Sequence, residues 1–233
     1  STRYDDIIDT LATIVRDYGG RIFVRPGFEF GGTWFPYHAY LYPKAFRKIV
    51  DRFRAVAEPD SMAFLWCYYP AAPNDFDSTN GRGEYKWYPG DDHVDWFSLD
   101  LFKAGDFHPD SADSRRGVLT PKGKSERFLA MARDHAKPVF LSELSATYIN
   151  VTTDPSDGMN DWNAWFVPFF RFLSGHPEIK GFNYTNWNWS DYTQWAEWGD
   201  SRIEINPFIL ARYREELRNP RYIHLRTAAS GVN

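Results

Sequence analysis

Short apolar segments separated by longer amphipathic stretches constrain this chain more than any other feature. The apolar segments are rich in β-branched and aromatic residues, as buried strands are. There are five of them, at residues 21–25, 62–68, 94–102, 138–143 and 179–184. Apolar residues at helical spacing predict helices near residues 46–53, 125–135, 163–173 and 208–217. This alternation predicts a parallel sheet covered by helices on both faces, either doubly wound or closed into a barrel.

The chain is expected to open with a helix and not with a strand. Apolar residues recur at helical spacing from Ile7 to Val15, and Gly19-Gly20 ends the segment. A complete (β/α)8 barrel typically needs about 250 residues, whereas five strands are visible in these 233 residues. If the fold is a barrel, the chain begins at its third helix, and the first strands belong to a preceding segment.

Charge and composition narrow the classes of partner. The formal net charge of −4 leaves no broad basic surface, so we expect neither nucleic acid nor a membrane as a partner. The single cysteine, Cys67, excludes an intrachain disulfide and a cysteine-only metal site. We interpret Asp91-Asp92-His93 as a turn, because adjacent residues rarely converge on one metal ion. We therefore expect no metal ion and no cofactor.

Two glutamates follow apolar segments at the places where α/β barrels carry their chemistry. Glu29 comes a few residues after the segment 21–25, and Glu143 ends the segment 138–143. Catalytic groups of barrels sit where strands end and loops begin. Hydrolysis of a glycosidic bond needs one carboxyl group to protonate the leaving oxygen and another to attack or to activate water. One such carboxylate is as readily a structural ion pair, but the two together favour catalysis.

The residues around both glutamates resemble one family. RPGFEFGGTWF, residues 25–35, is similar to the strand-four signature of glycoside hydrolase family 26, Arg-Pro-x-His-Glu-x-Asn-Gly-x-Trp. Leu141-Ser142-Glu143 resembles the nucleophile segment of that family, and residues 88–96 resemble the stretch that enters its sixth strand. The resemblance implies a (β/α)8 TIM barrel, of which this chain supplies roughly the C-terminal five strands and their helices. It also implies retention of configuration, with Glu29 as the acid/base and Glu143 as the nucleophile.

The segment departs from the family signature at two positions beside Glu29. Phe28 stands where the family usually has His, and Gly31 stands where it has Asn. Phe102 is a third candidate departure, in place of a tyrosine that would hold the nucleophile. These changes predict either a preference for a sugar other than mannose or a catalytically silent carbohydrate-binding protein on the same barrel. The apolar neighbours of Glu29 are expected to raise its pKa.

Further residues are expected to contact the sugar. Aromatic residues make up 18% of the chain, which suits stacking on the apolar faces of sugar rings. The resemblance places Trp187, or Trp189 in its stead, at the floor of the reactive subsite. Arg25 is also a candidate to orient or neutralise Glu143. The expected substrate-binding residues are Arg25, Trp34, Trp66, Tyr68, Asp100, Trp187 and Trp189.

The sequence therefore predicts one glycosidase barrel domain over residues 1–233, incomplete at its N-terminus. Its expected activity is the retaining cleavage of a β-linked polysaccharide, β-mannan or β-glucan. The expected partners are a poly- or oligosaccharide substrate and a missing N-terminal segment of the same barrel. A secreted or extracellular location is inferred from this substrate class alone, because the sequence shows no signal peptide.

Overall fold

The computed structural model describes residues 2–108, 120–149 and 154–224. The chain divides into two compact units. The sheet unit comprises Ser1–Ser145 and Pro168–Thr185, and the C-terminal unit comprises Ala146–Val167 and Asn186–Asn233. The single domain expected over residues 1–233 stays a prediction. In the described part of the chain, no helix has the length and apolar character needed to cross a membrane.

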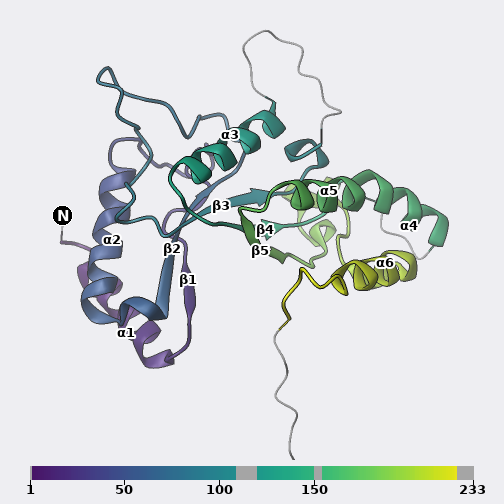
Figure 1. Cartoon of the computed structure of the whole chain (residues 1–233), viewed down its shortest axis with the longest axis horizontal. Helices are drawn as coiled ribbons and strands as arrows, with labels where there is room; N and C mark the ends of the chain where they lie inside the picture. Colours follow the sequence, from purple (N-terminus) through teal and green to yellow (C-terminus); the bar gives the residue numbers. More distant parts are fainter. Residues whose placement is uncertain (1, 109–119, 150–153, 225–233) are drawn as a thin grey trace, which may run out of the picture. The chain divides into compact units, whose positions relative to one another are not determined.

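All five predicted strands form, and all lie in the sheet unit. They are β1 (Ile22–Val24), β2 (Met62–Tyr68), β3 (Trp96–Leu101), β4 (Val139–Leu144) and β5 (Ile179–Tyr184). Neighbouring strands pair in parallel and follow one another in chain order (Figure 1). A doubly wound sheet reverses its strand order at a switch point, whereas a barrel does not. The strand order therefore confirms part of a (β/α)8 barrel and excludes the doubly wound alternative.

Helices join the strands of the sheet unit as the apolar spacing predicts. They are α1 (Asp5–Tyr18), α2 (Tyr42–Val56), α3 (Pro121–Asp134) and α5 (Val167–Gly175), of which α5 enters the sheet unit at Pro168. The opening helix α1 ends at Gly19, whose φ of +69° suits a glycine. Arg52 on α2 donates hydrogen bonds to Asp5 and Asp9 on α1. These ion pairs join the first two helices.

An aromatic core fills the space between the sheet and α3. Trp66 and Tyr68 of β2 have no exposed surface. The Phe128 ring on α3 lies 5.2 Å from the Trp66 ring and 5.6 Å from the Tyr68 ring, measured between centroids. Because side chains alternate along a strand, Leu65 and Cys67 point to the opposite face. We call this face, directed away from α3, the inner face of the sheet.

The C-terminal unit contains α4 (Pro155–Asp161), a π-helical segment η3 (Trp162–Phe166) and α6 (Pro207–Leu217). Helix α6 confirms the helix predicted over residues 208–217. The sequence predicts a helix that starts near residue 163, but helical structure already begins at Pro155. Asp154 caps this helix by accepting a hydrogen bond from the Ser156 backbone. The sequence does not predict this earlier start, because Pro, Ser, Asp and Gly in residues 155–158 are typical of a loop.

Candidate active site

Polar side chains from neighbouring strands meet on the inner face of the sheet. Arg25 follows β1, Asp100 lies near the end of β3, and Glu143 lies near the end of β4. The Nη1 of Arg25 donates to both carboxylate oxygens of Asp100, at 3.0 and 2.8 Å. Its Nη2 donates to Oε1 of Glu143. One guanidinium therefore joins the ends of three strands.

Asp100 is fully buried beneath this guanidinium. Its Oδ1 accepts a hydrogen bond from the backbone N–H of Glu143 at 2.9 Å, and its Oδ2 lies 3.1 Å from the Sγ of Cys67. Together with Arg25, these donors occupy both oxygens of the carboxylate. The direct substrate contact predicted from the sequence does not fit this position, because Asp100 is 0% exposed. Its observed contacts instead hold Arg25 and Glu143 in place.

A register shift aims Glu143 at Arg25. The inner face of β4 is occupied by Ser142, whose hydroxyl hydrogen-bonds Ser98 on β3. Strict alternation would turn the next residue to the opposite face. The pairing of β3 with β4 shifts just before Asp100, so that Asp100 stands opposite Glu143. Such bulges commonly re-aim side chains beside active sites.

Glu29 lies half-buried in the loop after β1. Its φ of +50° belongs to the left-handed region, which is strained for a glutamate and concentrates at functional sites. The indole N–H of Trp34 donates to Oε2 of Glu29 at 2.7 Å. Burial raises the pKa of Glu29 to about 7; the charge of Glu143 adds to this rise, whereas the Trp34 hydrogen bond and Arg25 oppose it. The pKa of Glu29 is thus raised, as the sequence predicts from its apolar neighbours.

The cluster places one guanidinium among three carboxyl groups. Burial raises the pKa of Asp100 to about 8, although Arg25 opposes the rise and the carboxylate accepts four hydrogen bonds, from Arg25, Cys67 and the backbone of Glu143. Glu143 has a direct bond to Arg25, and within the described residues Glu29 has none. The two glutamates thus differ in environment: one binds the cation, and the other has a pKa near neutrality. An acid/base and a nucleophile need such an asymmetry.

The aromatic residues that the sequence predicts as sugar contacts differ in how far they are exposed and in the unit to which they belong. Trp34 is 48% exposed and holds Glu29. Trp66 and Tyr68 are turned toward α3 and have no exposed surface, so a sugar contact does not fit their positions. Trp187 is 47% exposed and Trp189 is half-buried, and both belong to the C-terminal unit.

Cys67 is a member of the cluster that the sequence analysis missed. Its Sγ lies 3.6 Å from Nη1 of Arg25 as well as close to Asp100. The signal was present in the alternation along β2, since Cys67 falls between Trp66 and Tyr68. Large aromatic side chains belong on the face covered by a helix, so the small residue between them belongs on the inner face.

Both departures from the signature beside Glu29 have structural reasons. The Phe28 ring lies against the Arg25 guanidinium, with 4.5 Å from Cζ to the ring centroid, which adds a cation–π contact. Gly31 leaves no room for a side chain, because a Cβ there would lie 2.8 Å from the backbone oxygen of Asn74 and 2.9 Å from the Tyr68 ring. The side-chain amide of Asn74 donates to the Gly31 carbonyl at 3.0 Å. Glycine is therefore the residue that fits at position 31 of this loop.

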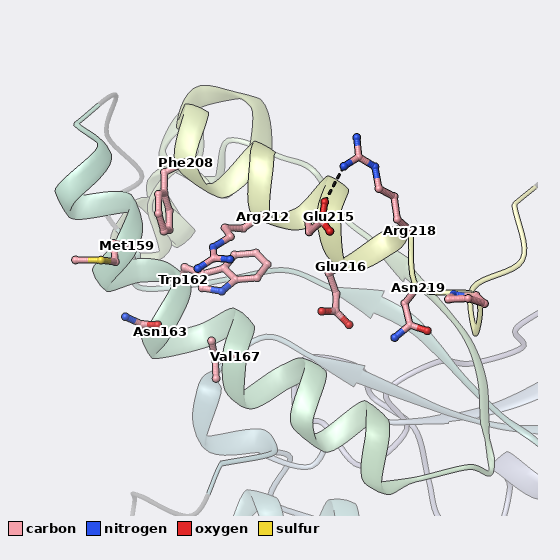
Figure 2. Close-up of a pocket in the computed structure, with 11 residues that line it drawn as sticks. Met159, Trp162, Asn163, Val167, Phe208, Arg212, Glu215, Glu216, Arg218 and Asn219 are labelled. Atoms are coloured by element: carbon pink, nitrogen blue, oxygen red, sulfur yellow. Dashed lines mark hydrogen bonds and ion pairs between the residues drawn. The ribbon is translucent and has the colours of Figure 1, made fainter.

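A separate pocket of about 780 Å³ lies in the C-terminal unit, between the α4–η3 segment and α6 (Figure 2). Trp162 and Arg212 are among the residues that line it. Its Glu215 pairs with Arg218 at 2.7 Å, and both side chains are largely exposed, so this pair contributes little. The pocket has neither the buried carboxylate nor the shared guanidinium of the inner-face cluster.

A partial (β/α)8 barrel with two glutamates at its strand ends is the arrangement of a class of carbohydrate hydrolases. The chain belongs to glycosyl hydrolase family 26, whose family model matches residues 2–176. It is 29% identical to a β-1,3-xylanase of Vibrio sp. and to one of Alcaligenes sp., over 95% of this chain and 48% of each of those proteins. The chain therefore spans about half the length of these curated relatives.

Solved structures support the fold independently. A GH26 β-mannanase from Bacteroides ovatus superposes with a TM-score of 0.58 at 15% sequence identity. The match covers 93% of this chain and 57% of the mannanase chain. At this identity the likeness concerns the fold, and it agrees with the partial barrel seen in the strand order.

Replacing Gly31 with Asn, the residue of the family signature, is expected to destabilise the protein by about 1–3 kcal/mol, because overpacking must displace Asn74 or Tyr68. Chemical denaturation measures this change in the free energy of unfolding. The matched control is Gly81→Asn, since a Cβ at Gly81 meets nothing within 4 Å. Equal stabilities of the two variants would contradict the crowding described at Gly31.

The raised pKa of Glu29 predicts a pH-dependent stability. The folded-state pKa of about 7 exceeds the ordinary 4.5, so the folded state holds the proton more tightly than the unfolded chain does. The resulting stability is fully present below the ordinary pKa and is lost as the pH rises through about 7. Glu29→Gln keeps an uncharged side chain, so its Tm should exceed that of the parent by about 2–4 °C near pH 8 and match it near pH 4. The exposed Glu58→Gln is the control, and an equal pH dependence in all three proteins would contradict the assignment.

Proposed function

We propose that the protein containing this chain is a retaining β-glycanase in which Glu29 is the acid/base and Glu143 the nucleophile. The observation that carries the proposal is the contrast between the two glutamates. Glu143 binds the Arg25 guanidinium, whereas burial raises the pKa of Glu29 to about 7. A glycosidase needs one carboxyl group that gives up a proton near neutral pH and one that remains an ionised nucleophile.

In the first half of the proposed reaction, Glu29 donates its proton to the glycosidic oxygen while Glu143 attacks the anomeric carbon. The bond to the leaving sugar breaks, and a covalent glycosyl-enzyme forms. In the second half, Glu29 takes a proton from water, and the water displaces Glu143 with net retention. Arg25 and the backbone bond to Asp100 fix the position of Glu143, so the carboxylate needs little reorganisation before attack.

The proposed substrate is a neutral β-linked polysaccharide. The sequence analysis favoured β-mannan or β-glucan. Relatives named as β-1,3-xylanases match 95% of this chain, and they add β-1,3-xylan as a candidate of equal standing. The Phe28 and Gly31 positions support a difference from mannan-cleaving members, because both lack the polar side chain of the family signature. An extracellular location remains a prediction from this substrate class.

We further propose that an N-terminal segment of the same barrel completes the sheet. Among the described strands, β1 and β5 each have one edge without a strand neighbour. Phe23 on β1 is 45% exposed, although its ring lies 5.2 Å from Trp96 and 4.9 Å from Phe140. Exposed edges and an aromatic face of this kind favour pairing with further strands.

A catalytically silent carbohydrate-binding protein is the second candidate. The loss of the two polar side chains beside Glu29 is the observation that favours it. The contacts of Glu143 oppose it, because a pure binding protein has no need for a carboxylate positioned by Arg25 and Asp100.

Glu143→Gln in the full-length parent is expected to lower hydrolysis by at least about 1000-fold, because an amide cannot act as the nucleophile. Activity is measured on β-1,3-xylan, β-mannan and β-glucan, with products identified by mass spectrometry and their anomeric configuration by NMR. Glu58→Gln, an exposed glutamate after α2, is the matched control and should keep full activity. Binding of polymer without cleavage by the parent would favour the silent alternative, and an inverted product would overturn the role of Glu143.

The pH profile tests the role of Glu29. Since the acid must be protonated in the free enzyme, kcat/KM is expected to fall as the pH rises above about 7, the pKa of Glu29. The fall should approach tenfold for each pH unit. In Glu29→Gln, the alkaline decline should vanish along with most of the activity on substrates that have poor leaving groups. An alkaline limb that persists unchanged in this variant would assign the acid to another residue.

A further inference from the structure

The backbone of Glu29 is strained, and the bond from Trp34 does not account for how it is held. Its φ of +50° lies in the left-handed region. A residue other than glycine keeps such a conformation when the surrounding structure over-determines it. Trp34 bonds the side chain of Glu29 and not its backbone. The contacts that fix the backbone of residues 29–32 therefore decide where the Glu29 carboxyl group lies.

The loop that carries Glu29 is held in part by its own residues. The Gly32 N–H donates to the Glu29 carbonyl at 2.9 Å, which closes a turn over residues 29–32. Within this turn, the Phe30 ring is fully buried and stacks on the Trp66 ring, with 4.8 Å between the centroids. The carbonyl of Gly31, the next residue of the turn, finds its partner outside the loop.

Asn74, on the loop between β2 and β3, supplies two donors to the Gly31 carbonyl. Its backbone N–H lies 3.2 Å from this oxygen, and its side-chain amide lies 3.0 Å from it. The Tyr68 hydroxyl donates to the Asn74 carbonyl at 3.1 Å, so the residue is held from its other side as well. One carbonyl of the turn is thus fixed by two hydrogen bonds from a residue 43 positions away in the sequence.

The segment that carries Asn74 is itself fastened to helix α3. Lys124 on α3 donates to the Ala72 carbonyl at 2.9 Å and pairs with Asp75 at 3.0 Å. Phe76, two residues after Asn74, is buried among the aromatic rings between the sheet and α3. Contacts before and after Asn74 therefore fix the direction in which its amide points.

The burial of Glu29 depends on the same turn. Burial is the largest cause of its raised pKa, about 7. A turn released at Gly31 can relax toward an ordinary backbone conformation, which turns the Glu29 carboxyl group toward water and lowers its pKa. An acid must also lie within hydrogen-bond distance of the leaving oxygen, and a small misplacement slows proton transfer. Both the proton affinity and the aim of Glu29 are therefore linked to the hold on Gly31.

We propose that Asn74 is a positioning residue for the acid/base: by holding the Gly31 carbonyl with two donors, it keeps Glu29 in its strained, half-buried position. Asn74 acts through the turn and not on the sugar. The inference rests on the proposed function of Glu29 as the acid/base. The position of Glu29 can also be measured without hydrolysis, so the two proposals are tested separately.

The kinetic test uses Asn74→Ala in the full-length parent, which removes the side-chain donor and leaves the backbone donor. On the polysaccharide that the parent cleaves, kcat is expected to fall about 2- to 10-fold, the range of one hydrogen bond, with KM little changed. On an aryl β-glycoside of the same sugar, the nitrophenolate leaves without a proton, so the rate of the first step should stay within about twofold of the parent. The alkaline limb of kcat/KM should move to lower pH, because Glu29 is less buried.

Asn80→Ala is the matched control. It makes the same substitution further along the same loop, where the Asn80 amide donates to Glu84 at 2.7 Å. This variant should keep the leaving-group dependence and the pH profile of the parent. If Asn74→Ala and Asn80→Ala have the same leaving-group dependence and the same alkaline limb, the proposal is overturned.

A thermal test needs no substrate. Near pH 8, Glu29→Gln is expected to raise the Tm of the parent, because it removes a carboxylate whose ionised form is disfavoured by burial. In the Asn74→Ala background this gain should fall below about 1 °C, since Glu29 is then closer to water. In the Asn80→Ala background the full gain should persist. An undiminished gain in the Asn74→Ala background would overturn the proposal, and the same melts verify that each variant folds.

Failure of this inference is distinguishable from failure of the proposed function. If the parent cleaves no polysaccharide, the catalytic proposal fails, and the melts alone decide whether Asn74 holds Glu29 in its buried position. If Glu143→Gln and Glu29→Gln lose hydrolysis as expected while Asn74→Ala behaves like Asn80→Ala, the catalytic proposal stands and the role of Asn74 fails.

Discussion

The Arg25 guanidinium is the interaction on which the inner face of the sheet depends. Its planar fork reaches Asp100 with one nitrogen and Glu143 with the other, so one side chain fixes the ends of β1, β3 and β4. A lysine could supply the charge but not this fixed pair of directions. Without Arg25, the fully buried Asp100 carboxyl group would lose the hydrogen bonds that both of its oxygens accept from this guanidinium, which is destabilising. Stability and the placement of Glu143 are therefore tied to the same residue.

The two faces of the sheet carry different kinds of side chain: one face forms the aromatic core, and the other carries the polar cluster. Toward α3, rings such as Trp66 and Phe128 exclude water and hold the helix on the sheet. On the other face, alternation brings Cys67 and Asp100 into contact with Arg25. Strands of this kind are apolar along most of their length, and their polar residues are concentrated at the carboxyl ends. The catalytic proposal for Glu29 and Glu143 depends on that concentration.

The parts of the fold that the sequence predicted are those with a repeating pattern. Five apolar segments and the intervening helices follow from hydrophobic spacing, and the placement of Glu143 at a strand end follows from the end of an apolar run. Alternation alone shows only that Trp66 and Tyr68 share a face. Their burial beneath α3 follows once their size is considered, because large aromatic side chains belong on the face that a helix covers. The position of Asp100 opposite Glu143 depends on a register shift between β3 and β4, which the hydrophobic pattern does not predict. Helix α4 was not predicted because its first residues are typical of a loop; in the structure Asp154 caps it.

The crowding at Gly31 couples the loop that carries Glu29 to the core of the sheet unit. The space that an asparagine would need is taken by the Asn74 backbone and the Tyr68 ring, and Tyr68 in turn packs on Phe128 of α3. A larger side chain at position 31 therefore disturbs a second loop, a strand and the helical layer at the same time. A substitution that would normally be judged by its effect on the site must here also be judged by its effect on the packing between the sheet and α3.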